Sequence, residues 1–355
     1  MSWTESTAAI GEVDAVLESV GLSHGRRLSR RGSWSGGERV GRGSGAVREP
    51  ERRSGERTQA VEGAGVVRAE AWQGLPWLRH GFSTRSGGRS TVYGGETLNL
   101  GWTKEDDPGW VAENRRAFAQ AVAGGAAKLV TVRQVHSAMI RVIRSGDVPL
   151  ATEDGRAVLR GDGLMTDVAG VLLGIQTADC VPVIVADLRR RAVAAFHAGW
   201  RGTLGRIVER GIGTMRLEYG SKPKDLIAAI GPAIGACCYS VGEEVRHEFE
   251  SQFAYAAELF SEQYDSDPVR QKYPLLFLTA RAPGHSPIGP QMHLDLAEAN
   301  RRQLLDAGLR PRSITMMGLC TACARDGAGE RSYFSHRAEH GFTGRMMSAV
   351  GVAEE

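Results

Sequence analysis

The sequence predicts one folded domain of the α/β or α+β class with mixed sheets. Short apolar runs that are typical of buried strands alternate with segments of helical periodicity between residues 71 and 350. No repeat of fixed period interrupts this alternation. The length of 355 residues and the hydrophobic fraction of 42% are enough to bury one substantial core or two smaller ones.

The overall composition argues against several classes of protein. A formal net charge of +3 is nearly balanced and predicts no polyanionic partner such as a nucleic acid. Five cysteines are too few for a secreted disulfide framework. No apolar run reaches the roughly 18–20 residues of a membrane span, and the start of the chain lacks the pattern of a signal peptide. We therefore expect a cytoplasmic protein without membrane association that is a monomer or a homodimer.

Residues 1–70 differ in composition from the rest of the chain. The apolar spacing in residues 1–20 is consistent with one short helix, whereas residues 21–65 are rich in Gly, Ser, Arg and Glu and have almost no apolar periodicity. Such a composition cannot bury enough surface to offset chain entropy. We expect residues 1–70 to form a disordered extension and residues 71–355 to form the folded domain.

The expected strands are short runs rich in Val, Ile and Leu. They lie at 128–132, 139–143, 171–175, 181–186, 192–196, 226–230 and 313–317. The connecting segments are a glycine-terminated loop at 80–88, a polar excursion at 145–160, a proline-rich irregular stretch at 265–291 and a turn at 320–323.

Four segments have the apolar spacing of helices, at 108–123, 203–219, 242–262 and 295–308. The first has Pro108 near its start, a position that suits proline. Two glycines, Gly211 and Gly213, lower the regularity expected of the second. The fourth begins with the helix N-terminal signature of Asp295 followed three residues later by a glutamate.

Two neighbouring stretches carry polar residues next to buried strands. Thr-Ala-Asp-Cys at 177–180 separates two apolar runs, and His197 ends a third run before Gly199. Cys180 and His197 are therefore expected at strand ends, where a rigid scaffold can aim them into a cleft. A thiolate and an imidazole there form either a nucleophile with its base or two ligands of a soft metal. A polar step inside core strands is costly unless it is used, which favours a role for Asp179 and Cys180 over simple packing.

The nine histidines are separated by their sequence context. His136 and His197 each follow a short strand and stand beside small or polar loop residues. Solvated side chains are expected instead for His24, His247, His285, His293 and His340. Together with Cys180, His136 and His197 supply three donors that suit Zn²⁺ and leave a fourth position for water or substrate.

The other four cysteines form two pairs, Cys237 with Cys238 and Cys320 with Cys323. Nominally they permit a second metal site with four sulfur ligands. Adjacent cysteines rarely both bind one tetrahedral ion, so structural packing is the preferred interpretation of these residues.

Several short blocks of polar residues and glycine follow one another along the folded part. They read His-Gly-Phe-Ser-Thr-Arg at 80–85, Leu-Asn-Leu-Gly at 98–101, Gln-Val-His at 134–136, Gly-Asp-Gly at 161–163, Thr-Ala-Asp-Cys-Val-Pro-Val at 177–183, His-Ala-Gly-Trp-Arg-Gly at 197–202, Gly-Pro-Ala-Ile-Gly-Ala-Cys-Cys-Tyr at 231–239, Cys-Thr-Ala-Cys at 320–323 and Phe-Ser-His-Arg at 334–337. In this order they resemble the signature blocks of the YfiH-type family, also called the laccase-domain or polyphenol-oxidase-like family. The resemblance covers the whole folded part of the chain.

This resemblance implies a fold, a metal and an activity. The implied fold is α+β in four layers, α/β/β/α, similar to the catalytic domain of bacterial cytotoxic necrotizing factors. The implied metal is zinc, held by His136, Cys180 and His197. The implied activity is that of a purine nucleoside phosphorylase acting on adenosine, inosine, guanosine and S-methyl-5′-thioadenosine, with deamination of adenosine as a second reaction. Residues 71–355 are then the catalytic domain, with purine nucleosides and phosphate as its small-molecule partners.

Roles for individual residues are suggested by the resemblance and by side-chain chemistry. The expected catalytic residues are Cys180, His197, Asp179 and Arg201. The expected substrate-binding residues are Arg85, Asn99 and Asp162. Arg201 is expected to neutralise phosphate or developing charge, because a guanidinium presents a fork that matches it. Ala338 stands where the family often has a second arginine, which weakens the expected anion site.

Other functions agree with parts of the sequence. A metal-free hydrolase or amidase would use Cys180 as nucleophile and His197 as base, and it would remain active in chelator. A copper-dependent polyphenol oxidase is disfavoured, because a multicopper site needs more histidines than His136 and His197 supply; copper therefore fits less well than zinc. A binding role without catalysis predicts that substitutions of the ligands leave the phenotype intact.

Overall fold

The computed structural model describes residues 60–61, residues 65–263 apart from 126, 148 and 154, and residues 291–354. The helix expected in residues 1–20 lies outside the described residues. Most of the disordered extension and of the irregular stretch expected at 265–291 lie outside them as well.

One six-stranded sheet combines the two ends of the described chain with its middle. Its strands, in spatial order, are β1 (Ala60–Val61), β2 (Val66–Val67), β3 (Leu78–Ser83), β15 (Met346–Val352), β8 (Val171–Thr177) and β5 (Lys128–Thr131). Neighbouring strands are antiparallel except β5 and β8, which are parallel. β4 (Ser86–Ser90) follows β3 and makes isolated bridges to Thr97.

The second six-stranded sheet is built from the centre of the chain. Its strands, in spatial order, are β14 (Ile314–Met316), β11 (Leu226–Ile230), β9 (Val181–Asp187), β10 (Val193–Ala198), β7 (Gly163–Thr166) and β6 (Ile140–Val142). The outer pairs β11–β14 and β6–β7 are parallel, and the inner pairs are antiparallel. β12 (Phe260–Gln263) and β13 (Gln291–Leu294) form a separate antiparallel pair.

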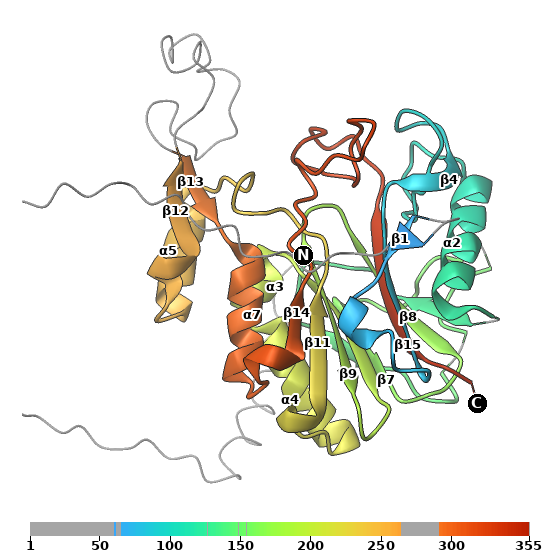
Figure 1. Ribbon diagram of the computed structural model, residues 1–355, viewed down its shortest axis with the longest axis horizontal. Coiled ribbons are helices and arrows are strands. Elements are labelled where there is room, and N and C mark those ends of the chain that lie inside the picture. The colour runs from blue at the N-terminus through green and yellow to red at the C-terminus, as the bar shows by residue number, and fades with distance from the viewer. Residues whose placement is uncertain are drawn as a thin grey trace, which may run out of the picture. The chain divides into compact units, whose positions relative to one another are not determined.

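The helices lie on the outer faces of the two sheets. On the first sheet lies α2 (Pro108–Ala123), which begins with Asp107 accepting hydrogen bonds from the two amides of Gly109 and Trp110. On the second sheet lie α3 (Trp200–Leu204), α4 (Ile207–Tyr219) and α7 (Leu296–Asp306), with α5 (Glu243–Gln252) beside β12 and β13 (Figure 1). Short 3₁₀ turns lie at η1 (Glu70–Trp72), η2 (Pro223–Asp225), η3 (Ala256–Leu259) and η5 (Pro311–Ser313).

The alternation of side chains along β9 shows how the layers stack. All seven of its residues are buried. Val183 packs with the helices over the second sheet, whereas Ile184 points the opposite way and packs between the two sheets. On the first sheet, Leu173 faces the same inter-sheet core, while Leu172 packs beneath α2. The class with mixed sheets is therefore confirmed as α+β, and the layers follow the order α/β/β/α.

Several elements lie where the apolar pattern predicts them, and others do not. The helix expected at 108–123 and the strand expected at 226–230 have the predicted bounds. The single helix expected at 203–219 is wrong, because Arg206 has a left-handed backbone with φ 54° that separates α3 from α4. The helix expected at 242–262 ends at Gln252, after which the extended Phe253 leads into η3 and β12. The loop expected at 80–88 is wrong, because most of these residues belong to the end of β3 and to β4.

The segment just before residue 71 takes part in the first sheet. Val66 and Val67 are buried in β2 and pair with Ser83 and Phe82 of β3. A two-residue strand is too short to produce a visible period, so the apolar pattern placed these residues in the N-terminal extension.

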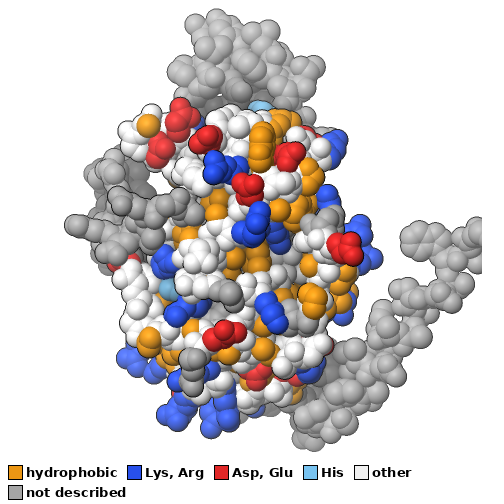
Figure 2. Space-filling model, turned by 90° about the vertical axis from the view of Figure 1, so that its right-hand side faces the viewer, with side chains coloured by type: hydrophobic (Ala, Val, Ile, Leu, Met, Phe, Trp, Pro, Cys, Tyr) orange, Lys and Arg blue, Asp and Glu red, His pale blue; other side chains and the backbone are white. Residues whose placement is uncertain are grey.

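No helix in the described part of the chain is long and apolar enough to cross a membrane. Figure 2 shows the face on the α2 side, where side chains of both charges stand among apolar ones. This mixture agrees with the nearly balanced net charge of the chain.

Candidate metal centre and active-site cavity

Three donor side chains from separate segments converge at one end of the second sheet. His136 lies in the loop after β5, Cys180 lies between β8 and β9, and His197 lies near the end of β10. Their ligand atoms all lie within 4.8 Å of one another. The rings of His136 and His197 meet edge to face with centroids 4.9 Å apart. The structure thus brings together residues that are separated by up to 61 positions in the sequence.

The backbone is unusual at two positions beside these donors. His136 has φ 58° and Asp179 has φ 92°, both in the left-handed region that non-glycine residues rarely occupy. Such conformations persist only where surrounding contacts hold them, and they occur frequently at functional sites.

A single carboxylate, Asp162, holds the loop of His136 in this conformation. Asp162 is fully buried, and its two oxygens accept hydrogen bonds from the backbone amides of Val135, His136 and Ser137 and from the Ser137 hydroxyl. Burial would raise the pKa of Asp162, but hydrogen bonds from His197 and Ser137 outweigh it and lower this pKa to about 2. Asp162 is therefore ionised, with both oxygens engaged.

The same carboxylate orients His197. Nδ1 of His197 lies 2.9 Å from Oδ1 of Asp162, and the backbone amide of His197 donates to the carbonyl of Asp162 at 2.7 Å. With Nδ1 bonded to the carboxylate, Nε2 is the nitrogen left to face Cys180 and His136. A carboxylate behind a histidine is the usual outer contact of a metal-binding imidazole.

Cys180 and His197 also stabilise each other's charged forms. Burial would raise the pKa of the Cys180 thiol, but His197 and His136 outweigh it and lower this pKa to about 6. Burial would lower the pKa of His197, but Cys180 and Asp162 outweigh it and raise this pKa to about 9. The thiolate is the form of cysteine that binds metals and attacks electrophiles.

The arrangement fits a zinc ion. Zn²⁺ prefers imidazole and thiolate, and a catalytic zinc has three protein ligands and an open position. Gly199 leaves the required room, because a Cβ there would lie 3.0 Å from Sγ of Cys180 and 3.2 Å from the His136 ring. His136, Cys180 and His197 are thus the residues that could hold a metal at this end of the sheet.

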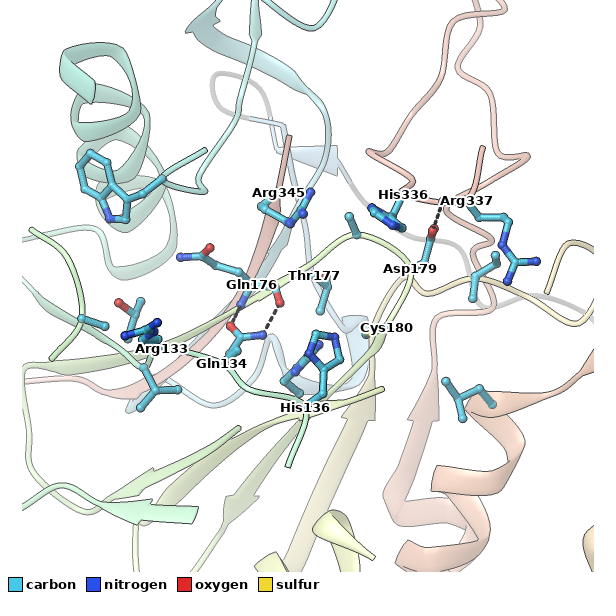
Figure 3. A pocket seen from close by; sticks show the side chains of 18 of the residues that line it. Arg133, Gln134, His136, Gln176, Thr177, Asp179, Cys180, His336, Arg337 and Arg345 are labelled. Atoms are coloured by element: carbon cyan, nitrogen blue, oxygen red, sulfur yellow. Dashed lines mark hydrogen bonds between the residues drawn. The ribbon is translucent and has the colours of Figure 1, made fainter. Parts of the chain in front are cut away.

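The three donors open onto a cavity of about 930 Å³. Besides the donors, its wall includes the polar or aromatic residues Trp102, Arg133, Gln134, Arg156, Gln176, Thr177, Asp179, Tyr239, His336, Arg337 and Arg345. Figure 3 shows Arg133 and Arg345 on the side of Gln134 and Gln176, with His336 and Arg337 on the side of Asp179. One cavity therefore combines a group of metal donors with four guanidinium groups.

Asp179 is the only carboxylate among the described residues that line this cavity. Its Oδ1 accepts from the Thr321 hydroxyl and its Oδ2 from the Arg337 amide, both at 2.7 Å. Its carbonyl accepts from the Ile234 amide. These contacts hold Asp179 in its left-handed conformation, directly beside Cys180.

Three other residues expected in the site lie outside the cavity wall. Asn99 is fully buried and bonds to Asp106, to Gly101 and to the amide of Arg345. Arg85 pairs with Glu339 at 2.5 Å and lies over the ring of Phe334. Arg201 is exposed on α3, where its guanidinium lies 4.3 Å from the ring centroid of Trp200.

The sequence reasoning missed the arginines that do line the cavity. Arg133 directly precedes the Gln-Val-His block, so its position next to a candidate ligand was a usable signal. Arg345 directly precedes β15, far away in the chain, and no local pattern marks it. Gln134 bonds with both ends of its side-chain amide to the backbone of Gln176 and so ties this loop to β8.

Of the histidines expected to have solvated side chains, some are exposed in the structure and one is buried. His247 and His340 are exposed, as predicted. His293 is only 9% exposed, and its Nδ1 lies 2.5 Å from the carbonyl oxygen of Ala236, so the expectation of a solvated side chain is wrong. His293 is buried because it belongs to β13, which begins where the proline-rich stretch ends. His24 and His285 lie outside the described residues.

Several known proteins are similar to this chain over most of its described part. The purine nucleoside phosphorylase YlmD of Geobacillus stearothermophilus is 36% identical over 289 residues, which are 79% of this chain and 95% of the relative. A purine nucleoside phosphorylase of Deinococcus radiodurans is 34% identical over 287 residues, covering 79% of this chain and 94% of the relative. The adenosine deaminase RL5 from an unknown prokaryotic organism is 31% identical over 273 residues, covering 76% of this chain and 92% of the relative.

Solved structures show the same architecture. The crystal structure of YfiH from Bacillus licheniformis matches with a TM-score of 0.68 and 30% identity over 83% of this chain and 98% of that chain. The crystal structure of YlmD from Geobacillus stearothermophilus matches with a TM-score of 0.66 and 34% identity over 84% of this chain and 99% of that chain. Residues 79–353 match the family described as multi-copper polyphenol oxidoreductase laccase, and the chain therefore belongs to this family, together with YfiH and YlmD.

Proposed function

We propose that this protein is a zinc-dependent purine nucleoside phosphorylase that splits adenosine, inosine, guanosine and S-methyl-5′-thioadenosine with phosphate. The observation that carries the proposal is the position of His136, Cys180 and His197 on the wall of a cavity that arginines also line. A volume of about 930 Å³ suits a small polar ligand together with an anion. The names of two relatives, both purine nucleoside phosphorylases, support this choice of substrate.

In this proposal, His136, Cys180 and His197 would hold the zinc ion, which would supply Lewis-acid chemistry at the reacting centre. The residues of the chain set the geometry around it. Asp162 fixes the ring of His197 through Nδ1 and holds the loop of His136, so that both imidazoles keep their direction.

Phosphate is proposed to bind between the cavity arginines. Arg133 and Arg345 lie on one side of the donors, and Arg345 is held in place by the carbonyls of Thr343 and Gly344 at 3.0 and 2.9 Å. A guanidinium presents a planar fork that matches phosphate oxygens. We therefore favour Arg133 and Arg345 over Arg201 and Arg85 as the anion site.

The purine base is proposed to occupy the opposite side, near Tyr239, His336 and Asp179. Phosphorolysis forms a bond from a phosphate oxygen to C1′ of the ribose and breaks the bond from C1′ to N9, so the leaving base needs a proton. Burial and the nearby Cys180 raise the pKa of the Tyr239 hydroxyl to about 12, which keeps it a neutral donor. Dihydrogen phosphate would bring this proton, and Asp179, the one carboxylate among the described lining residues, is the proposed group that relays it to the base.

The test combines metal analysis with product release. We expect purified protein to contain zinc and to release hypoxanthine and ribose 1-phosphate from inosine only when phosphate is present. Cys180→Ala should lose the active-centre zinc and at least 100-fold in rate, on the order expected for a lost metal ligand. His247→Ala, on the exposed face of α5, serves as the control. A chain with copper in place of zinc that oxidises phenols but leaves inosine intact would contradict the proposal.

Deamination of adenosine is a second activity proposed for the same site. The relative named adenosine deaminase RL5 favours it. In deamination, water adds to C6 of adenine and ammonia leaves, so phosphate is not consumed. Inosine and ammonia should therefore form from adenosine in phosphate-free buffer, and Cys180→Ala should abolish this reaction together with phosphorolysis.

The same side chains favour one alternative. Cys180, His197 and Asp162 lie in the order nucleophile, base and orienting carboxylate that cysteine hydrolases use. A metal-free amidase would keep full activity in chelator and would be inactivated by a single alkylation at Cys180. Loss of nucleoside cleavage in chelator, with recovery on addition of zinc, would rule this alternative out.

A further inference from the structure

Four cysteine side chains come together outside the active-site cavity. Cys237 and Cys238 belong to the loop after β11, and Cys320 and Cys323 belong to the turn after β14. Their sulfur atoms all lie within 4.8 Å of one another. Structural packing was the preferred interpretation because adjacent cysteines rarely share an ion, yet here both adjacent side chains point into the same cluster.

The spacing of the sulfurs suits a tetrahedral ion. Sγ of Cys237 and Sγ of Cys323 are 3.7 Å apart. A tetrahedron with zinc–sulfur bonds of about 2.3 Å has sulfur–sulfur edges of about 3.8 Å. A disulfide needs about 2.05 Å between its sulfurs, so the observed separation resembles a pair of metal ligands far more than a bonded pair.

The backbone of the loop is shaped around these sulfurs. The Gly235 amide donates to Sγ of Cys320 at 3.3 Å. A Cβ at Gly235 would lie 3.2 Å from Sγ of Cys237 and 3.6 Å from Sγ of Cys320, so a larger residue would press on the cluster. Backbone hydrogen bonds between Ala233 and the segment 319–321 hold the two loops in register. Cys237 and Cys323 are exposed, which gives an ion a path from solvent.

We propose that Cys237, Cys238, Cys320 and Cys323 form a second metal centre that binds one zinc ion through four thiolates. Four protein ligands leave no open position, so this centre is structural rather than catalytic. Its donors differ from those of the first centre, which has two imidazoles and one thiolate. The proposal does not depend on the activity proposed above.

The second centre would brace one wall of the active-site cavity. The loop of Cys237 also carries Ile234 and Tyr239, which line the cavity, and the Ile234 amide donates to the carbonyl of Asp179. The turn of Cys320 carries Thr321, whose hydroxyl donates to the carboxylate of Asp179 at 2.7 Å. An ion that binds both the loop and the turn would therefore stabilise the two segments whose Ile234 and Thr321 bond to Asp179.

The experiment measures zinc per chain in reducing buffer and the ligands of that zinc by X-ray absorption. Wild-type full-length protein should hold about two zinc ions per chain, matching one closed and one open site. His136→Ala/Cys180→Ala, which removes two donors of the first centre, should retain about one zinc with four sulfur neighbours at about 2.3 Å. Cys237→Ser/Cys323→Ser should also retain about one zinc, now bound by mixed nitrogen and sulfur.

Several results would overturn the second centre. One such result is a His136→Ala/Cys180→Ala variant that is free of metal, and another is zinc in this variant with nitrogen neighbours. Iron or copper in place of zinc on the four sulfurs would overturn the assignment of the ion. An intact mass two hydrogens lower after isolation without reductant, with no bound zinc, would identify a disulfide pair instead. The absorption measurement uses a chain whose four cysteines are native, so misfolding of Cys237→Ser/Cys323→Ser cannot imitate any of these results.

Discussion

At the residue scale, Asp162 links the two histidines of the candidate metal centre. One oxygen receives the His197 ring and the His136 amide, while the other receives the amide and hydroxyl of Ser137. Each of these groups donates a hydrogen bond to an ionised oxygen of Asp162. The NH₂ group of an asparagine at this position would therefore face another donor instead of an acceptor. Replacing this carboxylate by an amide would turn at least one attraction into a clash of donors.

Asp162→Asn should therefore weaken zinc binding by roughly 10–100-fold, the usual effect of losing an outer contact of a ligand histidine. Competition with a chromogenic chelator measures this affinity. Asp167→Asn, at an exposed position just beyond β7, is the matched control and should bind zinc like wild type. Unchanged affinity in Asp162→Asn would show that the carboxylate serves folding alone.

Substitutions of Arg133 and of Arg201 should affect phosphate binding differently. Arg133 lines the cavity, whereas Arg201 lies on α3 over Trp200. Arg133→Ala should raise KM for phosphate roughly 10–100-fold, as expected for a lost charge-assisted hydrogen bond of about 1.5–3 kcal/mol. Phosphate dependence of hypoxanthine release measures both variants. A larger rise in Arg201→Ala than in Arg133→Ala would restore the assignment made from sequence.

At the scale of elements, the packing of α4 on β10 explains one of the two glycines that lowered the regularity expected of this helix. A Cβ on Gly211 would overlap the Phe196 ring of β10, whereas a Cβ on Gly213 would meet open space. Gly211 thus lets the helix approach the sheet, and Gly213 has no such role. Both lie in the same helix, only two positions apart.

The two glycines form a matched pair for mutagenesis. Gly211→Ala should lower the free energy of unfolding by about 1–3 kcal/mol, because the core has no room for the methyl group. Gly213→Ala should raise it by about 1 kcal/mol, because alanine favours an exposed helix interior. Urea unfolding of both variants and wild type measures the difference. Equal effects of the two substitutions would contradict the close approach of α4 to Phe196.

At the scale of the whole molecule, a buried histidine ties the start of the folded chain to the first sheet. His80 of β3 is 4% exposed, its Nε2 accepts from the Ala69 amide at 3.1 Å, and its ring lies 5.0 Å from that of Trp72. Burial, with the nearby Arg68, lowers the pKa of His80 to about 4. Below the ordinary pKa of about 6.5, the unfolded chain therefore binds a proton that the folded chain excludes.

This histidine should make the protein sensitive to acid. The stability that neutral His80 contributes is complete above about pH 6.5 and is lost as the pH falls toward about 4. The loss in the free energy of unfolding should be on the order of 3 kcal/mol. His80→Gln, which retains an acceptor for Ala69, should lose less stability than wild type over this range. Urea unfolding at a series of pH values measures this, with His247→Gln on the surface of α5 as the control. Parallel curves for His80→Gln and wild type would show that the ring is protonated in the folded state.

Elements with local signals could be predicted from the order of residues alone. α2 has its capping Asp107, a proline at its first turn and one apolar face, so its bounds were predicted correctly. β9 and β10 are continuous apolar runs, which require a covering layer on both faces. Cys180 and His197 were found because polar groups end these runs, and burial of such groups is costly unless they have a use.

Which side chains meet in the sites depends on the pairing of strands that are distant in the sequence. Arg345 reaches the cavity from the start of β15 because this strand pairs with β8. Asp162 lies behind His197 because β7 pairs with β10, which moves it from the expected substrate contact to a buried partner of the ligand. Cys237 and Cys238 meet Cys320 and Cys323 because β11 and β14 run side by side and end together. These pairings join strands that are far apart in the sequence, so the local pattern of residues around each strand does not name its neighbour.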